Sequence, residues 1–274
     1  MPQGTLEQWL NDMKFEERHP LCNTMRTRVL EELARIERER NVTVLYACES
    51  GSRAWGFASP DSDYDVRFVY VEKPEWFVQV DAPSDVIERP LDDELDVSGW
   101  ELRKTLGLLR KSNPTLLEWL DSPLVYRSET AAVSQLRALA EAFYSPPAAR
   151  NHYLSMAKKN FRGYLQGESV RFKKYFYVLR PLLAVRWIDQ GRGRPPMTFS
   201  DLLSTVDDRA LLDEVDELLA LKRNADESAY GPRRPALHAF IEAELERAVP
   251  TLPRTREDSR QLDRYLRETV GLYA

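Results

Sequence analysis

Hydrophobic residues recur at helical spacing early in the chain and at strand spacing shortly afterwards. Four of them follow one another at steps of four and three residues: Met25, Val29, Leu33 and Ile36. This spacing predicts an amphipathic helix over 23–40, with Asn23 suited to cap its start. The next segment, 42–50, is apolar, rich in β-branched residues and too short for a helix. It therefore predicts a buried strand that ends at Gly51.

Further strands are predicted up to about residue 98, and helices after it. The segment SRAWGFASPDS holds turn formers and one short helical turn, and strands are expected at 63–71, 76–80, 85–90 and 94–98. From Trp100 onward the apolar period is helical, and proline and glycine divide the chain into segments. The expected helices cover 100–111, 115–121, 129–142, 148–166, 170–190, 207–223, 234–248 and 256–271.

The change of period predicts an α+β protein with two parts. The first part, 1–122, mixes strands and helices, and the second, 123–274, is helical. With 274 residues the chain is long enough for one large domain or two small ones. A hydrophobic content of 43% is that of an ordinary globular protein and excludes disorder as the main state.

Composition also bears on the cellular compartment. Two cysteines, Cys22 and Cys48, are typical of reduced thiols in an intracellular protein. No run of 18 apolar residues occurs, and the first twenty residues lack the basic and apolar regions of a signal peptide. We therefore expect a cytoplasmic protein without membrane spans.

Charge is distributed unevenly along the chain. The net charge is −5, yet the segment 145–200 holds eleven Arg and Lys residues against two acidic ones, Glu168 and Asp189. This basic segment lies in an otherwise acidic protein, so we expect it to face an anionic partner.

The most informative residues are two aspartates that follow a Gly-Ser pair. In a strand, Asp63 and Asp65 project from the same face, because successive side chains alternate. Two neighbouring carboxylates repel each other unless a cation lies between them, and oxygen ligands suit Mg²⁺ or Mn²⁺ better than zinc. Gly51 and Ser52 end the preceding strand in a turn whose backbone amides can receive a phosphate. The sequence thus predicts neighbouring metal and phosphate sites.

Gly-Ser, about ten residues and then Asp-hydrophobic-Asp-hydrophobic resembles the signature of the DNA polymerase β nucleotidyltransferase superfamily. The longer string GSRAWGFASPDSDYDVRFVYV is similar to a bacterial and phage branch described as YcgL-like or RlaP-like and linked to RNA repair. The resemblance covers about residues 42–100. It implies a small mixed β-sheet with flanking helices, a helical companion domain, two divalent ions, and transfer of a nucleoside monophosphate from an NTP.

The same resemblance implies a third carboxylate on a neighbouring strand. Asp96 is our choice, because it lies between Leu95 and Val97 and would emerge on the face opposite two buried residues. Glu94 has the same parity and is the alternative. The resemblance then assigns Asp63 and Asp65 to both ions and Asp96 to the catalytic ion and to deprotonation of an acceptor hydroxyl.

Residues beside the Gly-Ser turn have two interpretations each. The Arg53 guanidinium can brace a β- or γ-phosphate or pair with Asp61 or Asp63. Trp55 and Phe57 can stack on a base, although aromatic residues here more often pack between sheet and helix.

The basic segment offers one stripe for a nucleotide. On a helix, Lys173, Tyr177 and Arg180 fall at i, i+4 and i+7, a spacing suited to a triphosphate and a stacked base. A second stripe contains Lys174, Tyr177 and Pro181. A solvated basic face is the alternative for any single residue, but triphosphate and RNA charges favour the segment as a whole.

Other chemistry is not indicated. The three histidines, His19, His152 and His238, lack metal-ligand spacing, and Cys48 falls in the buried strand. We therefore expect a metal-dependent nucleotidyltransferase that moves NMP from an NTP to a hydroxyl, with an RNA end as acceptor, and releases pyrophosphate. The alternatives are the same transfer onto a protein hydroxyl, as in antitoxin-type enzymes, and an inactive module that binds nucleotide or RNA.

Overall fold

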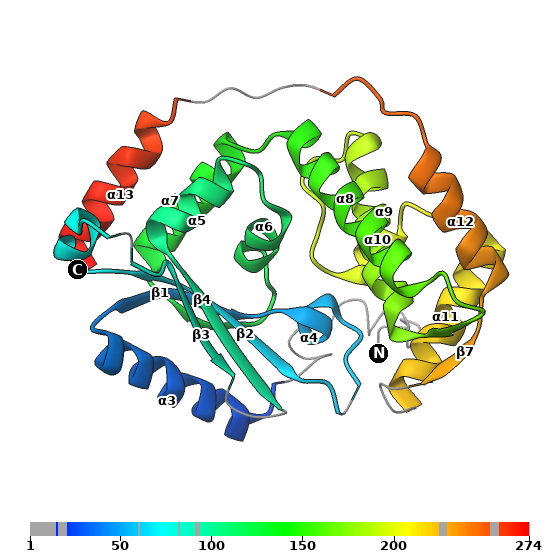
Figure 1. Cartoon of the computed structure of the whole chain (residues 1–274), viewed down its shortest axis with the longest axis horizontal. Coiled ribbons are helices and arrows are strands. Elements are labelled where there is room, and N and C mark those ends of the chain that lie inside the picture. The colour runs from blue at the N-terminus through cyan, green and yellow to red at the C-terminus, as the bar shows by residue number, and fades with distance from the viewer. Residues whose placement is uncertain are drawn as a thin grey trace, which may run out of the picture.

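The computed structural model is an α+β fold in which a central sheet lies beside a mainly helical part (Figure 1). It describes residues 15, 21–59, 61–81, 83–90, 94–224, 229–252 and 258–273. The five-stranded sheet has the order β3-β4-β2-β1-β5. Strand β2 runs parallel to β4 and antiparallel to β1, so the sheet is mixed.

Four of the strands confirm predicted segments. They are β1 (Thr43–Glu49), β2 (Tyr64–Val71), β3 (Val86–Pro90) and β4 (Leu95–Glu101). The fifth, β5 (Val125–Ser128), was not predicted, because four residues carry too little alternation to be recognised. It pairs with β1 at the edge of the sheet.

The sheet is buried on both faces. Helix α3 (Asn23–Arg40) covers one face, where Leu33 and Ile36 are fully buried among Val66 and Phe68 of β2. Alternate residues of β2, such as Val69, face the other core. That core is covered by α5 (Leu102–Leu109), α6 (Pro114–Leu120) and α7 (Thr130–Ala142).

Further elements follow β5 and α7 in the chain. The long helices are α8 (Pro146–Tyr164), α9 (Lys173–Asp189), α11 (Arg209–Asn224), α12 (Pro235–Glu246) and α13 (Arg260–Tyr273). The short elements are β6 (Ser169–Arg171), α10 (Phe199–Leu203) and β7 (Tyr230–Pro232). The expected long helices are confirmed, although α9 begins three residues later than expected because β6 includes residues 170 and 171. Helix α10 and strand β7 escaped prediction.

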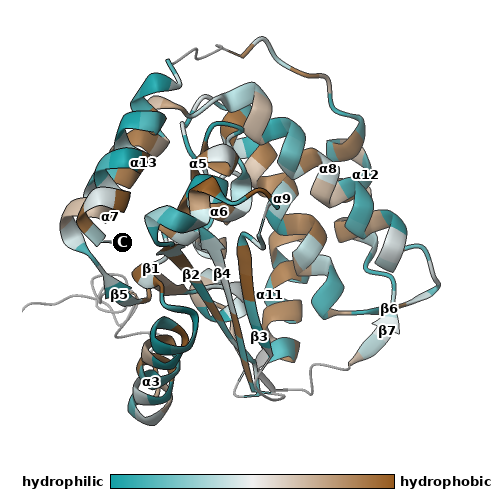
Figure 2. Cartoon of the chain, turned by 60° about the vertical axis from the view of Figure 1, so that its left-hand side comes forward, coloured by the Kyte–Doolittle hydropathy of each residue, from teal (hydrophilic) through white to brown (hydrophobic). Residues whose placement is uncertain are grey.

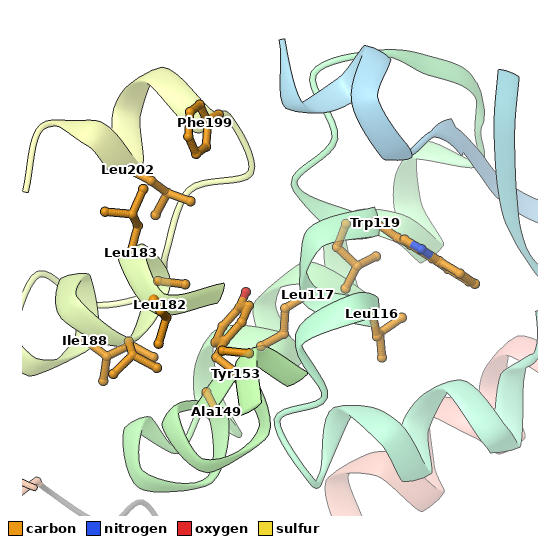
Figure 3. Packing of buried hydrophobic residues seen from close by; sticks show 14 of the residues in the cluster. Leu116, Leu117, Trp119, Ala149, Tyr153, Leu182, Leu183, Ile188, Phe199 and Leu202 are labelled. Atoms are coloured by element: carbon orange, nitrogen blue, oxygen red, sulfur yellow. The ribbon is translucent and has the colours of Figure 1, made fainter. Parts of the chain in front are cut away.

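One core joins the sheet to the helices. Figure 3 shows Leu182 of α9 next to Tyr153 of α8, with Leu117 of α6 on the other side of the Tyr153 ring and Leu183 of α9 near Leu202 of α10. On the other side of α6, Trp119 stacks on Trp100 of β4 with ring centroids 3.8 Å apart. Apolar packing is therefore continuous from β4 to α9.

The division expected after residue 122 stays a prediction. Strand β5 lies after that boundary and belongs to the sheet. Helix α13 also lies beside α7, and the Tyr265 hydroxyl donates to the carbonyl of Ala132 at 2.9 Å. Its hydrophilic side faces outward (Figure 2), and Leu262 and Tyr265 are buried.

Three local predictions were wrong. Residues 76–80 do not form a strand; a 3-10 helix, η1 (Pro74–Val78), begins at Pro74, which fixes its own φ and has no N–H for a strand ladder. Strand β4 continues through Trp100 to Glu101, where we expected helix. Asn23 is the first residue of α3 and not its cap, a position held by Cys22.

None of the described helices combines the length and apolarity needed to cross a membrane.

The end of β4 holds a carboxyl group whose ionisation opposes folding. Glu101 is fully buried, and its Oε2 accepts from the backbone N–H of Arg103 at 2.6 Å and caps α5. In the part of the chain that the structure describes, its Oε1 has no hydrogen-bond partner. Burial raises the pKa of Glu101 from 4.5 to about 7.

We expect Glu101→Gln to remove a pH-dependent loss of stability. The folded chain holds the Glu101 proton more tightly than the unfolded chain, so its contribution is full below pH 4.5 and is lost as pH rises through about 7. Chemical denaturation from pH 5 to 8 should show the wild-type free energy of unfolding falling by about 1 to 3 kcal/mol relative to the variant. Parallel pH profiles of the two proteins would contradict this.

Candidate functional site

The first residues of β2 and β4 bring two of the predicted carboxylates together. The strands are parallel, and their register places Asp65 directly opposite Asp96. Leu95 and Val97 are buried in the core under α3, whereas the Asp96 side chain is 51% exposed. Asp65 and Asp96 therefore emerge side by side from the sheet face away from α3.

A cation already bridges this pair. The Arg67 guanidinium donates through Nη2 to Asp65 Oδ1 at 2.8 Å and to Asp96 Oδ2 at 2.7 Å. Arg67 follows Asp65 by two residues on β2, so its side chain projects from the same face. The paired carboxylates are thus compensated by a positive charge, as like charges at this spacing require. We did not predict this contact.

Glu94, the alternative third carboxylate, lies elsewhere. It precedes β4, and its carboxylate is 3.7 Å from the guanidinium of Arg28, which belongs to α3 on the opposite face. Its main-chain carbonyl accepts from the N–H of Tyr64 at 2.8 Å. The register therefore favours Asp96.

Asp63 lies just before β2 in an exposed position held by Arg53. The Arg53 guanidinium donates to the main-chain carbonyls of Asp63 at 3.2 Å and Ser62 at 2.5 Å. It also lies 3.7 Å from the ring centroid of Tyr64. Arg53 thus fixes the backbone that presents Asp63, an arrangement different from the carboxylate pairing considered above.

Gly51 allows the turn after β1 to touch Asp65. It begins the short helix α4 (Gly51–Trp55) with a φ of +57°, in the left-handed region that favours glycine. A Cβ atom at this position would lie 2.0 Å from Oδ2 of Asp65. The Ser50 N–H also donates to the Asp65 carbonyl at 2.8 Å. Only glycine fits here.

Glu49, which we did not single out, supports Asp65 from behind. It is fully buried, and its Oε1 accepts from the backbone N–H of Asp65 at 2.8 Å. The Tyr126 hydroxyl of β5 donates to its other oxygen. Burial raises the pKa of Glu49 to about 7. A glutamate inside a predicted buried strand was the signal that could have identified it.

A pocket opens beside these carboxylates, between the sheet and the helical part. Its lining combines acidic, basic, hydroxyl and aromatic side chains from α4, β2 and the residues before it, α9 and α11: Ser52, Trp55, Phe57, Asp63, Asp65, Lys173, Phe176, Tyr177 and Lys222. Ser52, Lys173 and Tyr177 were predicted nucleotide contacts. Lys222 was not, because its place beside Phe57 depends on the packing of α11.

Two other residues of the predicted basic stripes do not line the pocket. Arg180 is 3% exposed, and its guanidinium donates to Glu118 Oε1 at 2.7 Å and to the Met197 carbonyl at 2.9 Å. It lies 4.7 Å from the ring centroid of Trp55. We therefore do not carry Arg180 forward as a nucleotide contact; it supports the pocket wall from beneath. Lys174 lies against the Tyr177 ring, outside the lining.

The aromatic residues at the end of α4 and just after it, Trp55 and Phe57, pack between the sheet and the helices, as expected. Phe57 is 4% exposed and stacks on Phe176 of α9 with centroids 4.7 Å apart. Trp55 contacts Tyr177 edge-on at 6.0 Å. These contacts fix the width of the pocket, while part of both rings borders it.

The described histidines and Cys48 do not line the pocket. His238 is buried and hydrogen bonded to the Tyr175 hydroxyl at 2.9 Å, whereas His152 is exposed. His19 lies outside the described residues. Burial raises the pKa of the Cys48 thiol to about 12, which leaves it unsuited to nucleophilic attack.

The carboxylates fit a divalent cation in donor type and in register. Oxygen donors suit Mg²⁺ and Mn²⁺, and the Asp65–Asp96 pair already takes a cation in the form of Arg67. Among the described residues, however, no three acidic, histidine or cysteine side chains lie close enough together to hold an ion. Closing such a site would require Arg67 to release the pair.

Comparison with known proteins agrees with the motif. A family model described as "RNA repair pathway DNA polymerase beta family" matches residues 25–268. The uncharacterized protein YcgL of Bacillus subtilis (strain 168) is 47% identical over 251 residues, which cover 90% of this chain and 96% of that protein.

A solved nucleotidyltransferase-like protein from Exiguobacterium sibiricum 255-15 aligns over 88% of this chain and 75% of its own, with 12% identity and a TM-score of 0.31, a similarity too low to support an argument. The family match, in contrast, spans most of the chain and includes the strands that carry the paired aspartates. The chain therefore belongs to RlaP, the RNA repair pathway DNA polymerase β family.

Proposed function

We propose that the protein is a metal-dependent nucleotidyltransferase that moves NMP from an NTP to a hydroxyl group, with an RNA end as acceptor. The observation that carries the proposal is one pocket lined by Asp63, just before β2, by Asp65 of β2, and by Lys173 and Lys222 on two helices. Carboxylates suit a divalent ion, and ammonium groups suit the phosphates that the ion leaves uncompensated. The family to which the chain belongs supports the same class of reaction.

In this proposal Asp63, Asp65 and Asp96 would hold Mg²⁺ or Mn²⁺, which would neutralise triphosphate charge and acidify the acceptor hydroxyl. The acceptor oxygen bonds to the α-phosphorus, the bond to the bridging oxygen breaks, and pyrophosphate leaves. Asp96 takes the hydroxyl proton, because it lies at the solvent-exposed end of the carboxylate pair. That two ions bind is what the resemblance to the superfamily implies, and it is part of the proposal.

The other pocket residues would bind and orient the NTP. Lys173 and Lys222 contact the triphosphate, Ser52 donates to a phosphate oxygen, and Tyr177 offers a ring to the base or sugar. Gly51 keeps the turn against Asp65. Arg53 holds the backbone of Asp63, and a direct phosphate contact by Arg53 or Lys174 remains a prediction.

We place the reaction in the cytoplasm, where NTPs and RNA ends are both available. Cys22 and Cys48 are free thiols, which fits a reducing compartment.

Radiolabel transfer tests the proposal. The protein is incubated with each NTP labelled at the α-phosphate, with Mg²⁺ or Mn²⁺, and with either RNA or total cell protein. Label on RNA supports the proposal. Label on polypeptide would move the acceptor to a protein hydroxyl, and saturable NTP binding without transfer would indicate a binding module.

We expect Asp65→Asn and Asp96→Asn to lower transfer by at least about 100-fold, because each removes a charge that stabilises the transition state. Asp96→Asn should leave NTP binding largely intact, since Asp96 does not line the pocket. The matched control is Asp216→Asn, an exposed aspartate of α11. Full transfer by Asp65→Asn would overturn the proposal.

Lys173→Gln and Lys222→Gln should each weaken binding of a non-hydrolysable NTP by roughly tenfold, the loss of one charge-assisted hydrogen bond. Lys111→Gln serves as a control, because Lys111 is exposed and lies outside the pocket. Equilibrium dialysis gives the three dissociation constants. Equal dissociation constants for all three variants would show that Lys173 and Lys222 do not contact the NTP.

Arg67→Gln should make the fold more dependent on divalent metal. Without its guanidinium, Asp65 and Asp96 repel each other, and the side chains are partly exposed, so we expect a loss of about 1 kcal/mol in metal-free buffer. Added Mg²⁺ should then raise the melting temperature of this variant more than that of the wild type. Arg127→Gln is the matched control, since it breaks a 2.7 Å ion pair with Glu37 away from the site. If Mg²⁺ raised the melting temperatures of the wild type, Arg67→Gln and Arg127→Gln by the same amount, Arg67 and the metal would not compete for the two carboxylates.

A further inference from the structure

An exposed tyrosine at the end of α8 is connected to the pocket by one lysine. Tyr164 is 46% exposed, and the ammonium group of Lys174 lies 4.0 Å from its ring centroid. The same ammonium group lies 4.9 Å from the ring centroid of Tyr177, which lines the pocket. The three residues form a continuous track from the surface to the pocket, which we call the Tyr164 track.

The track is fixed by contacts between α8 and α9. The side-chain amide of Asn160 on α8 donates to the main-chain carbonyl of Tyr177 on α9 at 2.8 Å. Figure 2 shows the two helices side by side. The distance from Tyr164 to the pocket mouth is therefore set by two packed helices and not by a loop, which suits a binding surface.

Charge at this end of α8 is positive. The helix PPAARNHYLSMAKKNFRGY contains no acidic residue, and Lys159 and Arg162 are exposed in its last two turns. Glu168 is the acidic residue that follows it in the chain, and it is exposed. Lys159 and Arg162 lie on other faces of the helix than Tyr164, since residues two and five positions apart do not share a face. A ligand on the Tyr164 track would thus meet the Lys174 ammonium group beside an exposed aromatic ring, on a helix without acidic side chains.

We infer that the Tyr164 track binds a single-stranded RNA segment next to the end that enters the pocket. Single-stranded nucleic acids bind where cationic groups follow the backbone and aromatic rings stack on bases, and the track supplies both. An acidic peptide would use the charges but not the exposed ring. This inference rests on the proposed function for its choice of RNA over DNA, since the proposed acceptor is an RNA end.

Fluorescence anisotropy with a labelled single-stranded RNA of about 12 nucleotides tests the track. Tyr164→Ala should weaken binding by about 5- to 100-fold, the range for loss of one stacked base. Tyr164→Phe should bind like the wild type, because it keeps the ring. Tyr230→Ala should also bind like the wild type, since Tyr230 is a 64% exposed tyrosine outside the track. A blunt RNA duplex of the same length should bind more weakly than the single strand, because its bases are stacked inside.

The outcome separates this inference from the proposed function. RNA binding that depends on Tyr164 but comes without nucleotide transfer would support the track and overturn the enzyme. Transfer to RNA with equal RNA affinities for wild type and Tyr164→Ala would overturn the track and leave the enzyme intact. Absence of RNA binding, or equal affinity for single strand and duplex, would also overturn the track. Binding of a non-hydrolysable NTP should change less than twofold in Tyr164→Ala, because Tyr164 does not line the pocket.

Discussion

The repulsion between Asp65 and Asp96 is the constraint around which the rest of the site is arranged. Parallel pairing of β2 and β4 places the two carboxylates opposite each other, and no rotation of a side chain removes them from the same face. A positive charge between the two carboxylates therefore stabilises the folded chain. Arg67 supplies it in this structure. Because Arg67 comes from the same strand as Asp65, the compensating charge is built into the sheet.

Rigid support surrounds this pair on the sheet side. Glu49 holds the main chain of Asp65, Gly51 packs against its carboxylate, and Arg53 holds the two carbonyls before β2. On the helical side, the buried pair of Arg180 and Glu118 supports Trp55 from beneath. Glu49, Arg53 and the Arg180–Glu118 pair thus hold neighbouring residues in place. The charged residues that line the pocket are Asp63 and Asp65 on the sheet side and Lys173 and Lys222 on α9 and α11.

The sequence could predict what depends on local period, and not what depends on distant packing. Parity on a strand was enough to place Asp65 and to choose Asp96, because alternation is a local property. The position of Arg180 could not be predicted locally, because its partner Glu118 lies 62 residues earlier in the chain. A residue that we expected on an exposed basic stripe therefore forms a buried ion pair. Lys222 was missed for the same reason. The segment 76–80 misled us because its aromatic and β-branched residues resemble a strand, while Pro74 starts a 3-10 helix and Trp76 packs under Arg103.

The stacked indoles of Trp100 and Trp119 have a practical consequence. Trp100 lies on β4 four residues after Asp96, and Trp119 lies on α6, which packs against the helical part. Two indoles at this spacing couple electronically, so their circular dichroism and emission depend on how the strand sits against the helix. The protein therefore carries an intrinsic optical probe of the strand that presents Asp96, and its signal can be followed without any label.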